Sequence, residues 1–127
     1  MKLRLKDNTL RLRLTKTETE LLQQRLAVKG STPFGPLPAQ ALTYAIVSNT
    51  QASQIDASFQ NQGITISVPH QQVTEWANTN QVSMRASLQY APQTSLEVLI
   101  EKDFQCLTER ANGDDADTFP NPAAQKT

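Results

Sequence analysis

The chain has 127 residues, and its 12 basic residues balance its 12 acidic residues, so that the formal net charge is zero at pH 7. A chain of this length can bury roughly two thirds of its unfolded surface and is typical of a single domain. A neutral chain has no overall field that attracts polyanions, so we expect neither DNA nor a membrane among its partners.

The N-terminal residues alternate apolar and cationic side chains with a period of two. Leucine alternates with lysine or arginine over residues 2–6, and leucine alternates with arginine over residues 10–14. Because successive side chains of a strand lie on opposite faces, both runs predict strands with one apolar and one cationic face. Asp7-Asn8 between them is typical of a tight turn, which predicts a β-hairpin over residues 2–14.

A helix and a further strand should complete the first half of the chain. Thr15 followed by Glu18 matches a capping box, and the resulting helix should end by about Gly30. Residues 31–38 contain three prolines, which cannot donate to a sheet ladder, so this segment is predicted as a loop or a broken edge strand. Alternating apolar side chains over residues 41–47 then predict a strand.

The second half of the chain repeats this order of elements. Alternation over residues 55–68 predicts a second hairpin, and Val73 and Trp76 share one face of a short helix that follows it. Residues 82–90 and 96–100 alternate again and predict two more strands.

Together these elements predict an α+β domain over residues 1–110, followed by an acidic, proline-containing tail at residues 111–127. About seven or eight strands are joined by connections too short for parallel crossovers, which favours a mostly antiparallel sheet. Two helices cannot cover both faces of such a sheet, so we expect it to be strongly curved or barrel-like. The domain should contain two duplicated hairpin-helix-strand-strand halves, at about residues 1–50 and 53–103.

Several segments carry a resemblance to a known family. These are the hairpin Met1 to Leu14 followed by Thr15, the Glu75-Trp76-Ala77 helix, the run Ile100 to Leu107 with its Phe-Gln-Cys-Leu end, and Asp117-Thr118-Phe119-Pro120-Asn121-Pro122. With them the chain resembles a family of small, uncharacterised bacterial proteins known as conserved hypotheticals. The Phe-Gln-Cys-Leu run and the Asp-x-Phe-Pro-Asn-Pro segment are its most specific part. The resemblance implies a single bacterial domain and implies no catalytic residues.

Charged side chains on the predicted strands form the first candidate site. If the polar face of a curved sheet pointed inward, its arginines and carboxylates could hold a polyphosphate with a metal ion, as in triphosphate-tunnel proteins. The Glu-x-Glu-x-Lys signature of such proteins is absent, because the first strand reads Lys-Leu-Arg-Leu-Lys. In the alternative, the face is solvated and opposite charges pair across strands. The candidate ligand-binding residues are Arg4, Arg11, Arg13, Arg85, Glu97 and Glu101.

The single cysteine and the single histidine form a second candidate. Cys106 cannot form an internal disulfide, and the N-terminus has no apolar run typical of a signal peptide, so we expect a cytoplasmic protein. One cysteine and one histidine fall short of a structural zinc set, and residues 114–117 lack the alternation of an EF-hand loop. We therefore expect no metal, no cofactor and no catalytic residue, with Cys106 buried and His70 exposed.

The sequence favours a non-enzymatic small binding or interaction module that uses the polar or charged face of its sheet, although it leaves catalysis open. The partner would be a protein or a small-molecule ligand. The alternative is a binding protein or phosphohydrolase for polyphosphate or a phosphate-containing small molecule, with a charged barrel interior. The tail should cover a sheet edge, packing residues 103–122 through Phe104, Leu107 and Phe119. The oligomeric state is left open.

Overall fold

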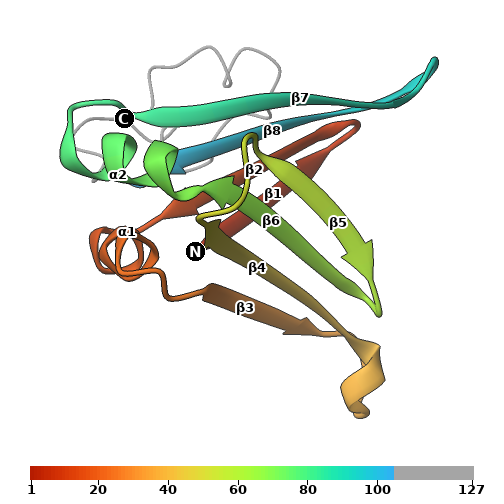
Figure 1. Cartoon of the computed structure of the whole chain (residues 1–127). Helices are drawn as coiled ribbons and strands as arrows, with labels where there is room; N and C mark the ends of the chain where they lie inside the picture. Colours follow the sequence, from red (N-terminus) through yellow and green to blue (C-terminus); the bar gives the residue numbers. More distant parts are fainter. Residues whose placement is uncertain (105–127) are drawn as a thin grey trace, which may run out of the picture.

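A computed structural model describes residues 1–104 of the chain (Figure 1). The described residues form an α+β fold with eight strands and two α-helices, as predicted, together with a short 3₁₀ helix at Pro38–Gln40. In chain order, the elements are β1 (Lys2–Lys6), β2 (Thr9–Leu14), α1 (Lys16–Gln23), β3 (Val28–Pro33), β4 (Ala41–Asn49), β5 (Asp56–Gln60), β6 (Gly63–Pro69), α2 (His70–Asn78), β7 (Ser83–Ala91) and β8 (Thr94–Lys102).

The strands form two open sheets, so the prediction of a single strongly curved or barrel-like sheet is wrong. Sheet A has the order β1-β2-β8-β7, and sheet B has the order β3-β4-β6-β5. The outer pairings are antiparallel, but both central pairings, β2 with β8 and β4 with β6, are parallel. Short connections exclude a parallel pairing only between consecutive strands. Both sheets are mixed because each central pair joins strands that are not consecutive in the chain, β2 with β8 and β4 with β6.

Each sheet combines strands from both halves of the chain. The hairpin β1–β2 pairs with β7–β8, and the hairpin β5–β6 pairs with β3–β4. Both halves have the same order of elements, namely two strands, a helix and two strands. Neither half can complete a four-stranded sheet on its own, so we expect the two halves to fold together.

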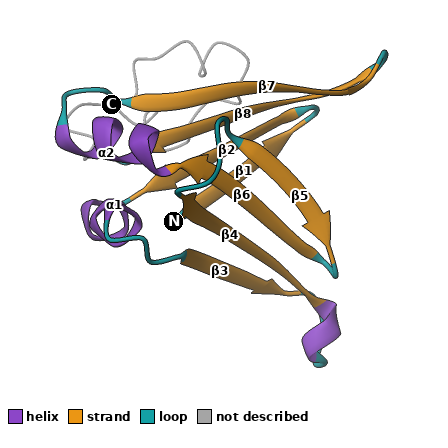
Figure 2. Ribbon diagram, in the orientation of Figure 1, coloured by secondary structure: helices purple, strands orange, loops and turns teal. Residues whose placement is uncertain are grey.

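Both helices lie at the same end of the sheets and contact each other (Figure 2). The predicted capping box starts α1: Thr15 Oγ1 accepts a hydrogen bond from the Glu18 N–H (3.2 Å), and Glu18 Oε1 accepts one from the Thr15 N–H (2.9 Å). Pro69 ends β6 and immediately precedes α2. With eight and nine residues, neither α-helix of the described chain is long and apolar enough to cross a bilayer.

Helix α1 ends at Gln23, well before the predicted end near Gly30. Arg25 has a positive φ of 66°, and the Leu26 N–H donates to the Leu21 carbonyl (2.9 Å). This is a Schellman motif with arginine at the left-handed position where glycine is usual. The residues after the motif form the edge strand β3, which ends at Pro33, so the start of the segment predicted as a loop or a broken edge strand belongs to an edge strand.

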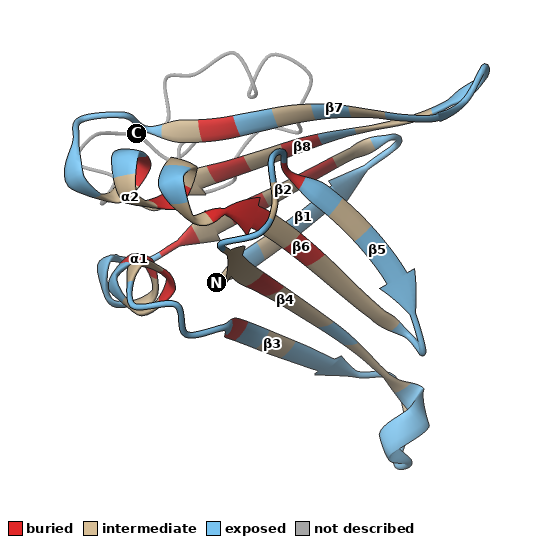
Figure 3. Cartoon of the chain, in the orientation of Figure 1, coloured by how far each residue is buried: buried red, intermediate tan, exposed pale blue. Residues whose placement is uncertain are grey.

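The hydrophobic core fills the space between the two sheets near the helices (Figure 3). The inner faces of the central strands contribute alternating buried residues, as the sequence predicted, and the helices add their buried faces. Toward the opposite end of the sheets the residues become half-buried and then exposed. The buried apolar residues are Leu10, Leu12, Leu14, Leu22, Val28, Ile46, Ile55, Ile66, Val68, Val73, Trp76, Met84, Val98 and Ile100.

Glu18 ties the start of α1 to the first residue of the chain. Burial alone would raise the pKa of Glu18, but hydrogen bonds from the Met1 amine and the Thr15 N–H, with the charge of that amine, outweigh it and lower the pKa. A carboxyl group with a lowered folded-state pKa stabilises the fold above its unfolded pKa, and this contribution disappears as the pH falls through the folded pKa. We expect Glu18→Gln to lower the free energy of unfolding at pH 7 by about 1 kcal/mol.

Urea unfolding of wild type and Glu18→Gln at several pH values between neutral and acidic tests this prediction. The difference between the two proteins should shrink as the pH falls. The exposed Glu20 on the same helix provides a control, since Glu20→Gln should change little at any pH. A difference for Glu18→Gln that is independent of pH would show that the carboxylate charge is not what stabilises this junction.

Candidate binding surface

The structure brings all six predicted site residues onto one face of sheet A. In the strand register, Arg4 pairs with Arg11, Arg11 pairs with Leu99, and Leu99 pairs with Arg85, so that these four residues form one row across the sheet. Arg13 pairs with Glu101 in the neighbouring row. Glu97, which is two residues before Leu99 on β8, lies in the row on the opposite side of Leu99. We define the cationic face as Lys2, Arg4, Lys6, Arg11, Arg13 and Arg85, together with the acidic residues Glu97, Glu101 and Asp103.

The cationic face lies on the side of sheet A opposite the core. Arg11 and Arg13 alternate along β2 with Leu10, Leu12 and Leu14, whose side chains are buried between the sheets. The charged residues therefore do not line a closed interior, and the prediction of a charged barrel interior around a polyphosphate is wrong. The alternative reading of a solvated face with paired charges describes the structure.

Ion pairs hold two of the three acidic residues of this face, whereas Glu97 Oε1 accepts a hydrogen bond from Ser87 Oγ (2.6 Å). Glu101 Oε1 lies 3.2 Å from Arg11 Nε and 3.3 Å from Arg13 Nε, and Asp103 Oδ2 lies 3.1 Å from Lys2 Nζ. Both carboxylates are half-buried but remain at the surface, where ion pairs contribute about 0–1 kcal/mol each. Six basic side chains face three carboxylates here, which leaves an excess of three positive charges.

Two shallow hollows lie next to each other on the cationic face. One, of about 210 Å³, is lined by Arg4, Lys6, Thr9, Arg11 and Leu99. The other, of about 180 Å³, is lined by Lys2, Arg4, Arg11 and Arg13 and so shares two arginines with the first. Both are smaller than the roughly 300–1,000 Å³ of typical small-molecule sites. The face therefore suits several separate anionic groups better than one enclosed molecule.

An apolar wedge that the sequence did not predict opens between the two sheets at the end away from the helices. It has a volume of about 590 Å³, and Leu5, Phe59 and Tyr90 on its walls are 55%, 67% and 53% exposed. Aromatic residues on alternating strands usually pack in the core, but here two short helices cover only one end of the sheets. The wedge is lined by Leu5, Asp7, Asn8, Leu10, Ala57, Ser58, Phe59, Ile64, Tyr90, Thr94, Ser95 and Leu96.

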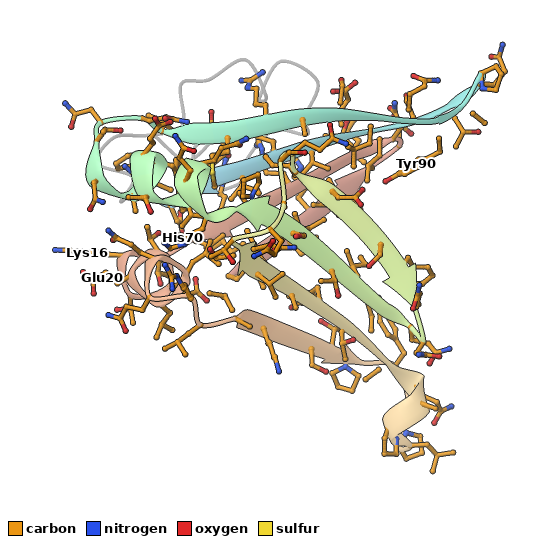
Figure 4. All side chains as sticks on the ribbon, viewed as in Figure 1. Lys16, Glu20, His70 and Tyr90 are labelled. Carbon is orange, nitrogen blue, oxygen red and sulfur yellow. The ribbon has the colours of Figure 1, made fainter. Side chains whose placement is uncertain are left out.

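Tyr90 reaches from β7 into the space between the far end of sheet A and β5 (Figure 4). Partial burial raises the pKa of its phenol, and the negative charge of Asp56 on β5 raises it further. Tyr90 therefore stays neutral at physiological pH. The wedge offers an apolar surface with a rim of neutral hydroxyl and amide groups and one carboxylate, that of Asp7.

His70 is the first residue of α2 and is half-buried, so the prediction of an exposed histidine is wrong. Its Nδ1 lies 2.6 Å from Ser48 Oγ on β4, and its Nε2 lies 3.4 Å from Thr74 Oγ1 (Figure 4). The contact with Ser48 links the start of α2 to sheet B, whereas Thr74 lies one turn further along the same helix. Among residues 1–104 there is no group of three or more histidine, cysteine, aspartate or glutamate side chains arranged to hold a metal ion.

The predictions for Cys106, for the acidic tail, and for Leu107 and Phe119 concern residues outside those that the structure describes. Phe104, which the sequence analysis expected to pack on the sheet, is 64% exposed. That part of the tail prediction is wrong.

The comparisons with known proteins identify the family of the chain but assign it no function. No curated protein and no solved structure shows a significant match to the chain. A family model described as a family of unknown function, DUF7009, matches residues 1–123. Because this match covers almost the whole chain, the protein belongs to the family of unknown function DUF7009.

Proposed function

We propose that the protein is a non-catalytic interaction module that binds an extended acidic segment of a partner protein on its cationic face. The observation that carries this proposal is the excess of three positive charges on an open, solvent-facing sheet surface. An excess of positive charge attracts acidic partners and speeds their association.

Comparison with sheet B indicates that the fold does not require these charges. In the hairpin β5–β6, Ala57 pairs with Ile66 as Leu3 pairs with Leu12 in β1–β2. With the two hairpins aligned in this way, Ser58, Thr65 and Ser67 occupy the positions of Arg4, Arg11 and Arg13. Asp56 occupies the position of Lys2, so a hairpin of the same geometry has no basic residue at these four positions, and the basic residues of β1–β2 are available for binding.

The geometry of the hollows supports an extended chain as the ligand. Same-face residues along a strand are about 7 Å apart, so adjacent hollows can each receive one carboxylate of an extended peptide. Arginine can bind a carboxylate with two parallel hydrogen bonds, and Arg11 and Arg13 carry N–H donors beyond the Nε atoms that lie near Glu101. Leu99, half-buried in the same row, adds apolar contact area between the arginines.

Two broader features belong to the same proposal. We infer that residues 1–50 and 53–103 are two copies of one structural unit; the identical order of elements in the two halves and the matching strand orders of the two sheets support this. We also keep the cytoplasmic location as a prediction, which the presence of only one cysteine supports.

A binding titration tests the function. The probe is a fluorescently labelled peptide of 12 residues that alternates glutamate with serine, and its anisotropy is measured with wild type and with the double variant Arg4→Gln/Arg11→Gln. We expect the double variant to bind at least about tenfold more weakly, because two charge-assisted contacts are lost, and binding to wild type to weaken as salt is raised.

The matched control is Lys16→Gln/Lys29→Gln, which removes the same charge away from the cationic face. Lys16 lies on α1 (Figure 4), and Lys29 lies on β3 of sheet B. This variant should bind like wild type, apart from a small change caused by net charge. An equal loss of affinity in both double variants would reduce the effect to net charge alone and would overturn the proposal. The proposal would also be overturned if the peptide bound neither wild type nor the variant Asp114→Asn/Asp115→Asn/Asp117→Asn, whose C-terminal segment is less acidic.

A further inference from the structure

We propose that the acidic stretch at residues 109–117 of this same chain docks on the cationic face and competes with the acidic partner. This inference rests on the proposed function, because it names an internal competitor for the same surface. It would make the C-terminal segment an autoinhibitory element that a stronger acidic partner displaces.

Charge complementarity is the first argument. Residues 109–117 contain Glu109, Asp114, Asp115 and Asp117 against Arg110 alone, a net charge of minus three. This equals in size the positive excess of the cationic face. The zero net charge of the whole chain therefore conceals two opposite local charges.

The point at which the described chain ends is the second argument. After β8, the Asp103 N–H donates to the Leu14 carbonyl (2.8 Å), and the Asp103 carboxylate pairs with Lys2 Nζ (3.1 Å). The first acidic residue after the strand is thus already bound at the edge of the cationic face. Phe104 follows and is exposed, so the chain continues from this edge.

The length of the remaining segment is sufficient for the contact. An extended chain spans about 3.4 Å per residue, so residue 109 can lie up to about 17 Å from Phe104 and residue 117 up to about 45 Å from it. A six-residue strand such as β2 is only about 20 Å long. A short tether also gives the tail an effective concentration of the order of millimolar at the face, so that even weak contacts are populated.

A spin label on the tail tests the docking directly. In the full chain, Cys106→Ser removes the native thiol and Ala116→Cys provides a single attachment point. We expect paramagnetic broadening of the backbone amide signals of β1 and β2 in sheet A, and little broadening of β5 and β6 in sheet B. High salt, or the added change Arg4→Gln/Arg11→Gln, should restore the lost signals.

Binding of the glutamate-serine peptide provides the second readout. The variant Asp114→Asn/Asp115→Asn/Asp117→Asn should bind the peptide about five- to tenfold more tightly than wild type, because its tail no longer competes. Binding by this variant alone would show complete autoinhibition and would also support the inference. Unchanged affinity, or a spin label that broadens no signals of sheet A, would overturn it.

The two proposals can fail separately. If the peptide binds wild type in an arginine-dependent way but the tail shows no contact, the inference fails and the proposed function stands. If the peptide binds neither wild type nor the tail variant, the proposed function fails, and the broadening pattern alone then decides whether the tail docks.

Discussion

Replacing Trp76 with alanine should lower the free energy of unfolding by about 3–5 kcal/mol, the range found for removing a large aromatic side chain from a core. The Trp76 side chain is fully buried in the hydrophobic core. Its Nε1–H donates to the Val82 carbonyl (2.9 Å), which ties α2 to the chain just before β7. Lys102 Nζ at the end of β8 lies 5.9 Å from the centre of the ring.

Urea unfolding followed by circular dichroism measures this loss. Trp76→Phe separates volume from hydrogen bonding, because it keeps most of the ring but removes the Nε1–H donor. The Val82 carbonyl keeps its hydrogen bond from the Lys102 N–H (3.0 Å), so we expect a cost of about 0.5–1.5 kcal/mol. The exposed Leu37, at the loop before β4, serves as the surface control, and Leu37→Ala should change stability by less than about 0.5 kcal/mol. A loss below about 1 kcal/mol for Trp76→Ala would mean that α2 does not pack on this core.

Two leucines of the same hairpin should respond very differently to truncation. Leu12 on β2 is 1% exposed and lies in the core, whereas Leu5 on β1 is 55% exposed and lines the apolar wedge. We expect Leu12→Ala to cost about 2–5 kcal/mol, because it removes buried methyl groups and leaves a cavity. Leu5→Ala should cost less than about 1 kcal/mol.

The pair of variants tests whether the sheets diverge in solution as they do in the structure. Residue type, hairpin and sheet face are the same for both leucines, so differences in unfolding midpoint reflect position alone. Similar losses at both positions would show that the wedge is closed and that Leu5 belongs to a larger core.

The sequence predicted individual elements well because alternation is a local signal. Both hairpins, the capping box at Thr15 and the last two strands were all found from residues close together in the chain. The arrangement of the strands was not found, because the parallel pairings of β2 with β8 and of β4 with β6 join strands from different halves. Local alternation states which residues share a face but not which strand lies beside which.

The same limit applies to the site. Alternation correctly placed Arg11 and Arg13 on one face, but only the packing of the leucines between two sheets decides that this face meets solvent. Leu99, in the same row as Arg4, Arg11 and Arg85, was missed because a single leucine on a polar face gives no periodic signal. The family match supports the resemblance to an uncharacterised family, whereas the bacterial source and the C-terminal motif stay predictions.

The core and the cationic face lie back to back on the same strands. Strand β2 places its leucines in the core and its arginines on the cationic face, so the packing that stabilises the fold also fixes the backbone beneath the charges. A rigid strand positions binding groups more accurately than a loop does. A surface of this kind needs no rearrangement of its backbone to receive an extended ligand.

The most direct test of binding at the cationic face is a titration of the isotope-labelled full chain with the glutamate-serine peptide, followed by backbone amide chemical shifts. Shifts should concentrate on β1, β2 and the middle of β8, disappear in Arg4→Gln/Arg11→Gln, and leave β5 and β6 unchanged. Shifts confined to the residues around Leu5, Phe59 and Tyr90 would instead identify the apolar wedge as the contact surface and contradict a role for the arginines.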